Sequence, residues 1–223
     1  MKNRGLIIVG TSEFSEYVYR TIIKEKAAHV VAFALDKEYM SSDTFNELPI
    51  VCIDDLNNVF DMCSMEVLLT TGYKKMNEGR RELYLKFNEL GYNIASFISS
   101  RAIVDSEEIG EGCIIMPMAY IPPFTKLGIC NVINVYSILG HTSYIGNFNW
   151  FSGNVTMGGN VSVGDNCFIG MNSLLKNGIH IASKTLIGAF SYMGDDSNEG
   201  LSYMGNPAQN KRGLKSSIVC DFI

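Results

Sequence analysis

The chain has three histidines, and one of them is placed where an imidazole could act on a bound molecule. His141 lies within the turn-like run Gly140-His141-Thr142, between two short apolar segments. A neutral imidazole accepts and returns a proton near neutral pH, which is the chemistry of a general base. We interpret His29 as the start of a strand and His180 as an outward surface residue. Because no histidines are paired, no metal site is expected.

A second group of polar residues lies in the N-terminal part of the chain. The loop Gly10-Thr11-Ser12 lacks the G-x-G-x-x-G spacing of a dinucleotide fold, so NAD binding is not expected. A Gly/Ser-rich turn that leads into a helix can still hold one phosphate or sugar, and Asp36 could meet hydroxyl groups nearby. Tyr73, Asn77 and Arg81 follow the third expected strand, where α/β sheets bind ligands. The alternative is a helix cap with a solvated basic turn.

The composition is that of a globular protein with a large core. The chain has 223 residues, of which 47% are hydrophobic and 18% charged, which excludes a disordered chain or a coiled coil. The net charge of −5 and the absence of a large basic cluster exclude a nucleic-acid partner. The apolar run before Gly10 is too short for a signal peptide or a membrane span. Six cysteines without a Cys-x-x-Cys pair indicate reduced thiols in the cytoplasm.

The first hundred residues alternate between short β-rich runs and amphipathic stretches, which is typical of an α/β unit around a parallel sheet. Helices are expected over residues 13–27 and 78–90. The first of these places Phe14, Val18 and Ile22 on one face. The pattern predicts strands at 6–9, 30–35, 66–70 and 93–97.

From residue 103 onward, an apolar residue recurs at every sixth position. Sixteen positions follow this rule: Ile103, Ile109, Ile115, Ile121, Leu127, Ile133, Leu139, Ile145, Phe151, Met157, Val163, Ile169, Leu175, Ile181, Ile187 and Met193. A small or β-branched residue follows four positions later in most hexads. Such a repeat predicts a solenoid in which each hexad forms one strand and one corner, and three hexads complete a coil. The large residue fills the interior, and His141 falls at a corner.

The whole pattern resembles a known family. The resemblance rests on Gly5–Ser12, Ala34–Asp36, the uninterrupted repeat with its segment Ile133–Gly146, and Gly205–Ala208. The chain resembles the sialic-acid O-acetyltransferase-like sugar acyltransferases, which include bacterial nucleotide-sugar N-acetyltransferases. This implies an α/β, Rossmann-like nucleotide-sugar-binding domain over residues 1–100. It also implies a left-handed parallel β-helix of hexapeptide repeats over 101–223, with a C-terminal tail, and a homotrimer with acyl-CoA sites between neighbouring β-helices.

The resemblance assigns catalytic roles to residues around the histidine. It implies that His141 is the catalytic base and that Asn134 helps to position it. Thr142 stands where the family usually has a carboxylate that raises the basicity of the histidine. Trp150 stands where the best-studied relatives have a second histidine, so its indole N–H is expected to face the acyl group.

The resemblance also assigns two sets of binding residues. Gly159 and Ala189 match acyl-CoA contacts, and the backbone N–H of Gly159 could approach the thioester carbonyl. The Gly205–Ala208 turn would lie along the pantetheine. The nucleotide sugar is expected to contact five residues: Gly10, Thr11, Ser12, Asp36 and Tyr73.

The implied function is that of a cytoplasmic transferase in the biosynthesis of a surface polysaccharide. The chain would transfer an acyl group, in the first instance acetyl from acetyl-CoA, to the amine of a nucleotide-linked 4-amino-4,6-dideoxy sugar. Sugar O-acetylation stays open, because the same base serves a hydroxyl nucleophile. A non-catalytic nucleotide-sugar-binding protein also stays open, because Thr142 carries no charge.

Overall fold

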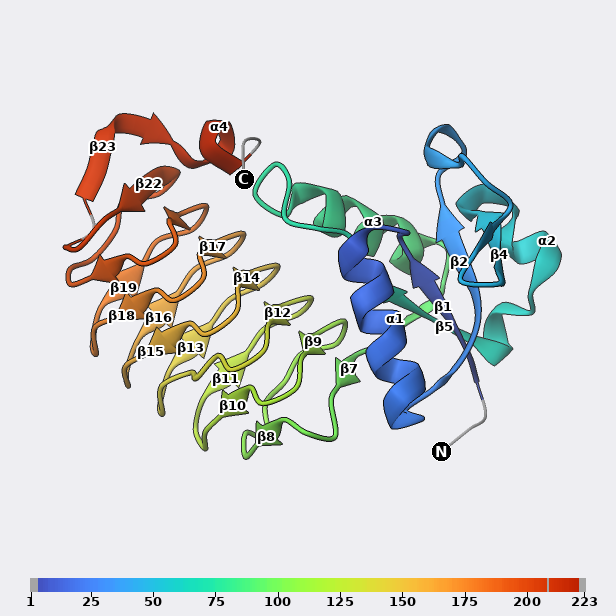
Figure 1. Ribbon diagram of the computed structural model, residues 1–223, viewed down its shortest axis with the longest axis horizontal. Coiled ribbons are helices and arrows are strands. Elements are labelled where there is room, and N and C mark those ends of the chain that lie inside the picture. Colours follow the sequence, from blue (N-terminus) through green and yellow to red (C-terminus); the bar gives the residue numbers. More distant parts are fainter. Residues whose placement is uncertain (1–3, 208, 221–223) are drawn as a thin grey trace.

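The computed structural model describes residues 4–207 and 209–220. An α/β unit formed by the first part of the chain stands beside a stack of β-coils formed by the second part (Figure 1). No helix in the described ranges is long and apolar enough to cross a membrane.

The α/β unit contains a mainly parallel sheet with the strand order β3-β4-β2-β1-β5-β6. Its strands are β1 (Gly5–Val9), β2 (His29–Leu35), β3 (Thr44–Phe45), β4 (Leu48–Cys52), β5 (Met65–Leu69) and β6 (Asn93–Ile94). Its helices are α1 (Glu13–Glu25), α2 (Leu56–Val59) and α3 (Glu78–Glu89), with short 3-10 turns at Lys37–Tyr39, Ile53–Asp55 and Met62–Ser64. The predicted strands and helices are confirmed within a few residues. The β3–β4 hairpin was not predicted, and the strand predicted at 93–97 is divided between β6 and the first strand of the coils.

Helix α1 shows why these residues form a helix. The Ser12 side chain accepts a hydrogen bond from the Ser15 backbone N–H, and the Ser15 side chain caps Ser12 in return. Val18 and Ile22 are fully buried, as predicted for one apolar face. Lys26 ends the helix in the left-handed conformation.

The second part of the chain is a parallel β-helix with three faces. Face 1 contains β7 (Phe97–Ile98), β9 (Ile114–Ile115), β12 (Val132–Ile133), β14 (Trp150–Phe151), β17 (Phe168–Ile169), β20 (Leu186–Ile187) and β22 (Leu201–Met204). Face 2 contains β8 (Ile103–Val104), β10 (Tyr120–Ile121), the bridge residue Ile138, β15 (Thr156–Met157), β18 (Leu174–Leu175) and β21 (Tyr192–Met193). Face 3 contains β11 (Lys126–Leu127), β13 (Tyr144–Ile145), β16 (Ser162–Val163) and β19 (His180–Ile181). The chain visits faces 1, 2 and 3 in turn, so the corners are called 1–2, 2–3 and 3–1.

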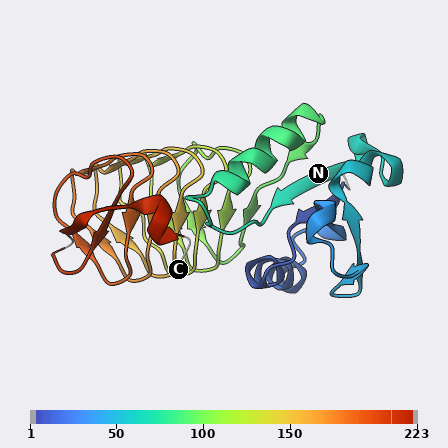
Figure 2. The same ribbon diagram turned by 90° about the horizontal axis from the view of Figure 1, so that it is seen from above.

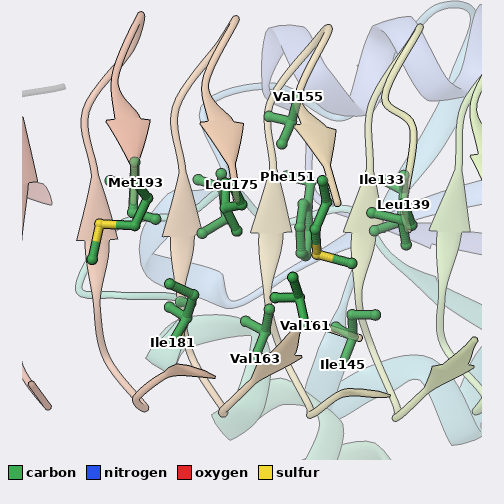
Figure 3. Close-up of a cluster of buried hydrophobic side chains, with 14 of the residues drawn as sticks. Ile133, Leu139, Ile145, Phe151, Val155, Val161, Val163, Leu175, Ile181 and Met193 are labelled. Carbon is green, nitrogen blue, oxygen red and sulfur yellow. The ribbon is translucent and has the colours of Figure 1, made fainter. Parts of the chain in front are cut away.

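The predicted interior is confirmed for most of the repeat. Strands of successive coils pair in parallel at an offset of 18 residues, as Val132 does with Trp150. The side chains of the sixfold register stack along the axis of the coils (Figure 3). Ile103 is an exception, because it is 58% exposed and pairs with the outward residue Tyr120. Val104 takes the inward place instead, since the first coil is one residue shorter than the others.

The α/β unit packs on face 1. The outward row of that face is apolar and covered: Ile114, Val132, Trp150, Phe168 and Leu186. Residues of β1 and α1 belong to the same buried cluster, among them Ile8 and Val18. One continuous core therefore joins the two parts of the chain.

A buried arginine adds hydrogen bonds to this interface. Arg80, in the first turn of α3, is fully buried and donates to the carbonyl oxygens of Cys130 (3.1 Å), Phe148 (3.3 Å) and Asn149 (3.3 Å) at the 3–1 corner. Burial lowers the pKa of Arg80 to about 10, so the guanidinium is charged at neutral pH. Asn77 donates to the Cys167 carbonyl at 3.1 Å, beside the guanidinium.

The C-terminal segment returns to the same interface. β23 (Gln209–Lys215) pairs antiparallel with β22, and the chain continues into α4 (Ser216–Cys220). The Cys220 thiol donates to the Tyr73 carbonyl at 2.9 Å. Figure 2 shows α4 at the side of the coils, close to the loop that precedes α3.

Candidate active site

His141 lies at the 2–3 corner, between Ile138 and β13, and its side chain is exposed. The turn around it is fixed to the coils on both sides. Its carbonyl accepts the Asn160 backbone N–H at 2.9 Å, and the Thr125 hydroxyl donates to the Gly140 carbonyl at 2.7 Å. The corner therefore holds the imidazole on a rigid support that faces outward.

The imidazole has one side-chain hydrogen-bond partner in the described structure. His141 Nδ1 lies 3.2 Å from Thr142 Oγ1. Thr142 adopts the left-handed conformation, with φ of 56°. A hydroxyl can accept from an imidazole N–H as a carboxylate does, but it carries no charge that would stabilise an imidazolium.

The ring of His141 also lies against Gly159 in the next coil. A Cβ on Gly159 would stand 2.6 Å from both Cε1 and Nε2 of the imidazole. A glycine is therefore required there for the histidine to keep this position.

Asn134 and Ala189 occupy the other edge of face 2. Asn134 follows β12 at the 1–2 corner, and its side chain donates to the Phe151 carbonyl at 3.1 Å. Ala189 is exposed at the same corner, in a later coil. The strand of face 2 separates this corner from His141, so a single chain does not bring Asn134 or Ala189 to the imidazole.

The expectation for Trp150 is corrected by the structure. Trp150 is 5% exposed on face 1, where its ring centroid lies 4.7 Å from that of Phe14 and 5.0 Å from that of Tyr73. The Arg80 guanidinium lies 5.7 Å from the same ring. Face 1 is the side of the coil that does not meet the 2–3 corner. The indole therefore packs in the interdomain core and does not face an acyl group beside His141.

Tyr73 and its neighbours also serve this interface. The Tyr73 ring packs on Phe168 at 4.7 Å as well as on Trp150. Asn77 is buried against Cys167 and Arg80, and Arg81 is exposed beside Glu78. Tyr73 and Asn77 therefore dock the two parts of the chain and are not a ligand site, whereas Lys74, Lys75 and Arg81 are exposed, as expected for a solvated basic turn.

Gly10-Thr11-Ser12 and Asp36 come together at the carboxyl edge of the parallel sheet, where β1, β2 and β5 end side by side. The Thr70 hydroxyl donates to the Val9 carbonyl at 2.9 Å, and its oxygen lies 2.8 Å from the Ser15 hydroxyl oxygen. Gly10 has φ of 122°, a conformation that favours glycine. The loop is therefore held in one shape at the point where the strand order reverses, which is the usual ligand crevice of such sheets.

Two further residues at this edge were not predicted. Lys86 in α3 donates to Asp36 and to Asp54, each at 2.9 Å, so the Asp36 carboxylate is already paired. The Thr71 hydroxyl oxygen is buried without a hydrogen-bond partner in the structure. Only the sheet topology reveals the position of Lys86, because it is fifty residues from Asp36 in the sequence.

Cys113 and Cys167 are packing residues of the core. Burial raises the pKa of Cys113 to about 11 and that of Cys167 to about 12, so both remain protonated thiols. Their predicted role in core packing is confirmed by their complete burial. No group of three His, Cys, Asp or Glu side chains in the described ranges is arranged to hold a metal ion.

Comparison with known proteins identifies the fold. No protein-family model matches the chain, and no curated protein matches it. Among solved structures, the acetyltransferase domain of PglB from Neisseria gonorrhoeae, also solved with acetyl coenzyme A, superposes with a TM-score of 0.83 at 20% identity, covering 94% of this chain and 100% of that one.

Solved structures of two other proteins superpose equally well. Histidine variants of perosamine N-acetyltransferase from Caulobacter crescentus, in complex with CoA and GDP-perosamine, give a TM-score of 0.83 at 20% identity over 93% of this chain and 96% of theirs. WeeI from Acinetobacter baumannii gives 0.83 at 21% identity over 92% of this chain and 99% of its own. The α/β unit and the β-helix are thus arranged as in these solved structures.

Proposed function

We propose that the chain is an acetyl-CoA-dependent N-acyltransferase that acts on a nucleotide-linked 4-amino-4,6-dideoxy sugar. The observation that carries this proposal is the exposed His141, fixed at a corner with Nδ1 against Thr142 and its ring over Gly159. The fold shared with PglB and perosamine N-acetyltransferase supports it. The resemblance in sequence to the sialic-acid O-acetyltransferase-like enzymes, which have a Rossmann-like first domain and a left-handed β-helix, also supports it.

In the proposed reaction, His141 acts as general base. Nδ1–H donates to Thr142 Oγ1, which leaves the lone pair on Nε2. Nε2 takes a proton from the sugar amine as its nitrogen attacks the thioester carbonyl carbon. The C–N bond forms, the C–S bond then breaks, and the imidazolium returns its proton to the departing thiolate. The products are the amide and free CoA, with no covalent enzyme intermediate.

The position of His141 supports a site shared between copies of the chain. The α/β unit covers face 1, and His141 stands at the corner that face 1 does not touch. A nucleotide sugar held at Gly10-Thr11-Ser12 and Asp36 therefore needs the His141 of a neighbouring copy. The edge bearing Asn134 and Ala189 would then face the histidine of the next copy.

Face 2 supports a trimer with this face turned inward. Apolar side chains are exposed along the face and at the 1–2 corner beside it: Ile103, Met118, Tyr136, Ile138, Leu174 and Phe190. Face 3, by contrast, presents Lys126, Tyr144, Ser162 and His180 in its outward row. A contiguous exposed apolar surface of this kind marks an interaction site. Three copies related by a threefold axis would bury it and bring each 2–3 corner to a neighbouring 1–2 corner.

The proposed acceptor and donor sites lie on opposite sides of His141. The α/β loops hold the nucleotide end of the acceptor, and the unpartnered Thr71 hydroxyl offers a further hydrogen bond there. Acetyl-CoA lies along Gly159 and the Ala189 of the next copy, with its pantetheine toward Gly205–Pro207. Ala189 has the small side chain that close backbone approach needs. Ala208, the last residue of the predicted turn, lies outside the described residues. We place the reaction in the cytoplasm, in the assembly of a surface polysaccharide.

The test is release of thiol from acetyl-CoA in the presence of uridine, thymidine and guanosine 4-amino sugars. The wild type should release free CoA with one acceptor, and His141→Ala should lose turnover while it still binds that nucleotide sugar. Turnover only with sugars whose amine is replaced by a hydroxyl would establish O-acetylation instead. Binding of nucleotide sugars without any thiol release, from acetyl-CoA or longer acyl-CoAs, would establish the non-catalytic alternative.

A further inference from the structure

Phe124 is an aromatic side chain with no evident role within its own chain. It lies at the 2–3 corner, one coil before Thr142, and is 81% exposed. No other large apolar side chain in the described ranges is as exposed. Because burial is what stabilises a phenylalanine, this ring contributes little to folding.

The backbone of Phe124 makes this placement costly. Its φ is 61°, in the left-handed region. The same position in the following coils of this corner is held by Thr142, Asn160 and Gly178. Asparagine and glycine enter this region with little strain, whereas a bulky side chain does so at a cost of about 1 kcal/mol. Bulky residues hold this conformation at the 1–2 corner too, among them Tyr136 and Phe190, so it is the exposure of Phe124 beside the base, and not its backbone alone, that points to a contact outside the chain.

Phe124 is rigidly connected to the base. The Thr125 hydroxyl donates to the Gly140 carbonyl at 2.7 Å, and the Lys126 N–H donates to the Ser143 carbonyl at 2.9 Å. Pro122 and Pro123 fix the backbone that leads into the turn. The backbone of Phe124 is therefore held about one coil spacing, roughly 4.8 Å, from that of Thr142 along the stack.

Phe124 and Gly159 lie in the coils on opposite sides of His141, so the coil of Phe124 shows which substrate its ring could contact. Gly159, against the His141 ring, lies in the coil toward the C-terminus. Phe124 lies in the coil toward the α/β unit, which stands at the N-terminal end of the stack (Figure 1). In the proposed reaction, acetyl-CoA lies on the C-terminal side of His141, beside Gly159. The acceptor sugar lies on the other side, toward the α/β unit and Phe124.

We infer that Phe124 is a specificity residue whose ring packs against the apolar face of the acceptor sugar. This inference rests on the proposed function. A 4-amino-4,6-dideoxy hexose presents a methyl group at C5 and the ring C–H bonds beside it, and these match an exposed aromatic face. A hydroxyl in place of a hydrogen on that methyl would be desolvated against the ring without a partner. Phe124 thus selects the deoxy sugar while His141 acts on its amine.

The decisive variant is Phe124→Asn, because asparagine suits the left-handed backbone and the variant is expected to fold at least as stably as the wild type. The KM for the nucleotide-linked deoxy sugar should rise about tenfold, with little change in the KM for acetyl-CoA, since the lost contact is to one substrate only. Phe124→Tyr keeps the ring and should keep the wild-type KM. The wild type should prefer the 6-deoxy acceptor over its 6-hydroxy analogue, and Phe124→Asn should lose most of that preference.

Two results would overturn the inference. An unchanged acceptor KM and preference in Phe124→Asn, with active wild type in the same assay, would refute it and leave the proposed function intact. Dissociation of the Phe124→Asn assembly in sedimentation velocity, with loss of all activity, would show instead that the ring contacts a neighbouring copy. Absence of turnover in the wild type would be a failure of the proposed function.

Discussion

The imidazole of His141 lies directly over Gly159, one coil further along the same corner, at a distance that no side chain at position 159 would permit. The relationship is independent of any ligand. It makes Gly159 a positioning residue for the histidine in addition to its proposed place beside acetyl-CoA.

Gly159→Ala is therefore expected to displace the imidazole and to lower kcat by about 100-fold, the effect of a misplacement near 1 Å. The backbone of Gly159 has no positive φ, so alanine itself fits and only the ring is in the way. Thermal denaturation should show that Gly159→Ala lowers stability in the wild-type background but not in a protein that also carries His141→Ala. An equal loss in both backgrounds would contradict the predicted contact.

Thr142→Val should lower kcat at least about tenfold, because valine keeps the shape of threonine but offers no acceptor to Nδ1–H, and part of the general-base contribution is lost. Thr142→Ser retains the hydroxyl and serves as the control. Steady-state kinetics at saturating acetyl-CoA measure the effect. Equal activity of the valine and serine variants would show that Thr142 does not orient the base.

Arg80→Met should destabilise the protein by about 3 kcal/mol, because it leaves several buried carbonyl groups without their donor. Calorimetry should show the α/β unit and the β-helix unfolding in separate transitions. Arg81→Met is a matched control in the same helix, since Arg81 is exposed, and its effect should stay within about 0.5 kcal/mol. Similar effects of the two substitutions would refute the docking role of Arg80.

Glu25 links the end of α1 to the first corner of the coils, and its contribution depends on pH. Partial desolvation raises its pKa, but hydrogen bonds from Ser99, Ser100 and Arg101 outweigh it, so the folded pKa is lowered. A lowered folded pKa gives stability that is present above the unfolded pKa, about 4.3, and lost as pH falls through the folded pKa. Glu25→Gln should cost about 2 kcal/mol at pH 7 and progressively less below pH 4.

The control for this pH effect is Glu16→Gln. Glu16 makes a surface ion pair with Arg20 at 2.6 Å, which is expected to contribute less than about 1 kcal/mol at pH 7. Denaturant titrations of both variants between pH 3 and 7 give the comparison. A difference between wild type and Glu25→Gln that does not shrink at low pH would contradict the assignment.

Leu174→Asp should disrupt the proposed trimer, because Leu174 is 45% exposed on face 2 and far enough along the stack to leave His141 untouched. Sedimentation should give monomers, and turnover should be lost although the chain stays folded by circular dichroism. Ser162→Asp on face 3 should remain trimeric and active. An active Leu174→Asp monomer would show that one chain holds a complete site.

The sequence was sufficient to predict the coils, because a residue that must fill a narrow interior leaves a strict sixfold signature. It failed at Ile103, where a coil shorter by one residue turns the side chain outward. It also failed for Trp150, whose role was inferred from its distance in sequence to His141 and not from the face on which it lies. The sequence did contain a sign that this face is covered. The residue just before each inward position of face 1 is apolar in every coil from Ile114 to Leu186, which indicates that the outward row, including Trp150, is buried. Sequence reasoning could not foresee Arg80, since its partners are carbonyl oxygens that any residue can supply.

The segment from Thr71 to Arg80 joins the two parts of the molecule through a shared core and buried hydrogen bonds, and this limits how the protein can work. Many transferases shield their reactants by closing one domain over another, which requires a hinge between the domains. Here Asn77 and Arg80 bond the segment between the two parts to backbone carbonyl oxygens of the coils. The α/β unit therefore cannot rotate to close over His141. In the proposed trimer, exclusion of water from the thioester would then come from the substrates as they fill the space between copies, and each turnover would end when the products leave a channel that is already open.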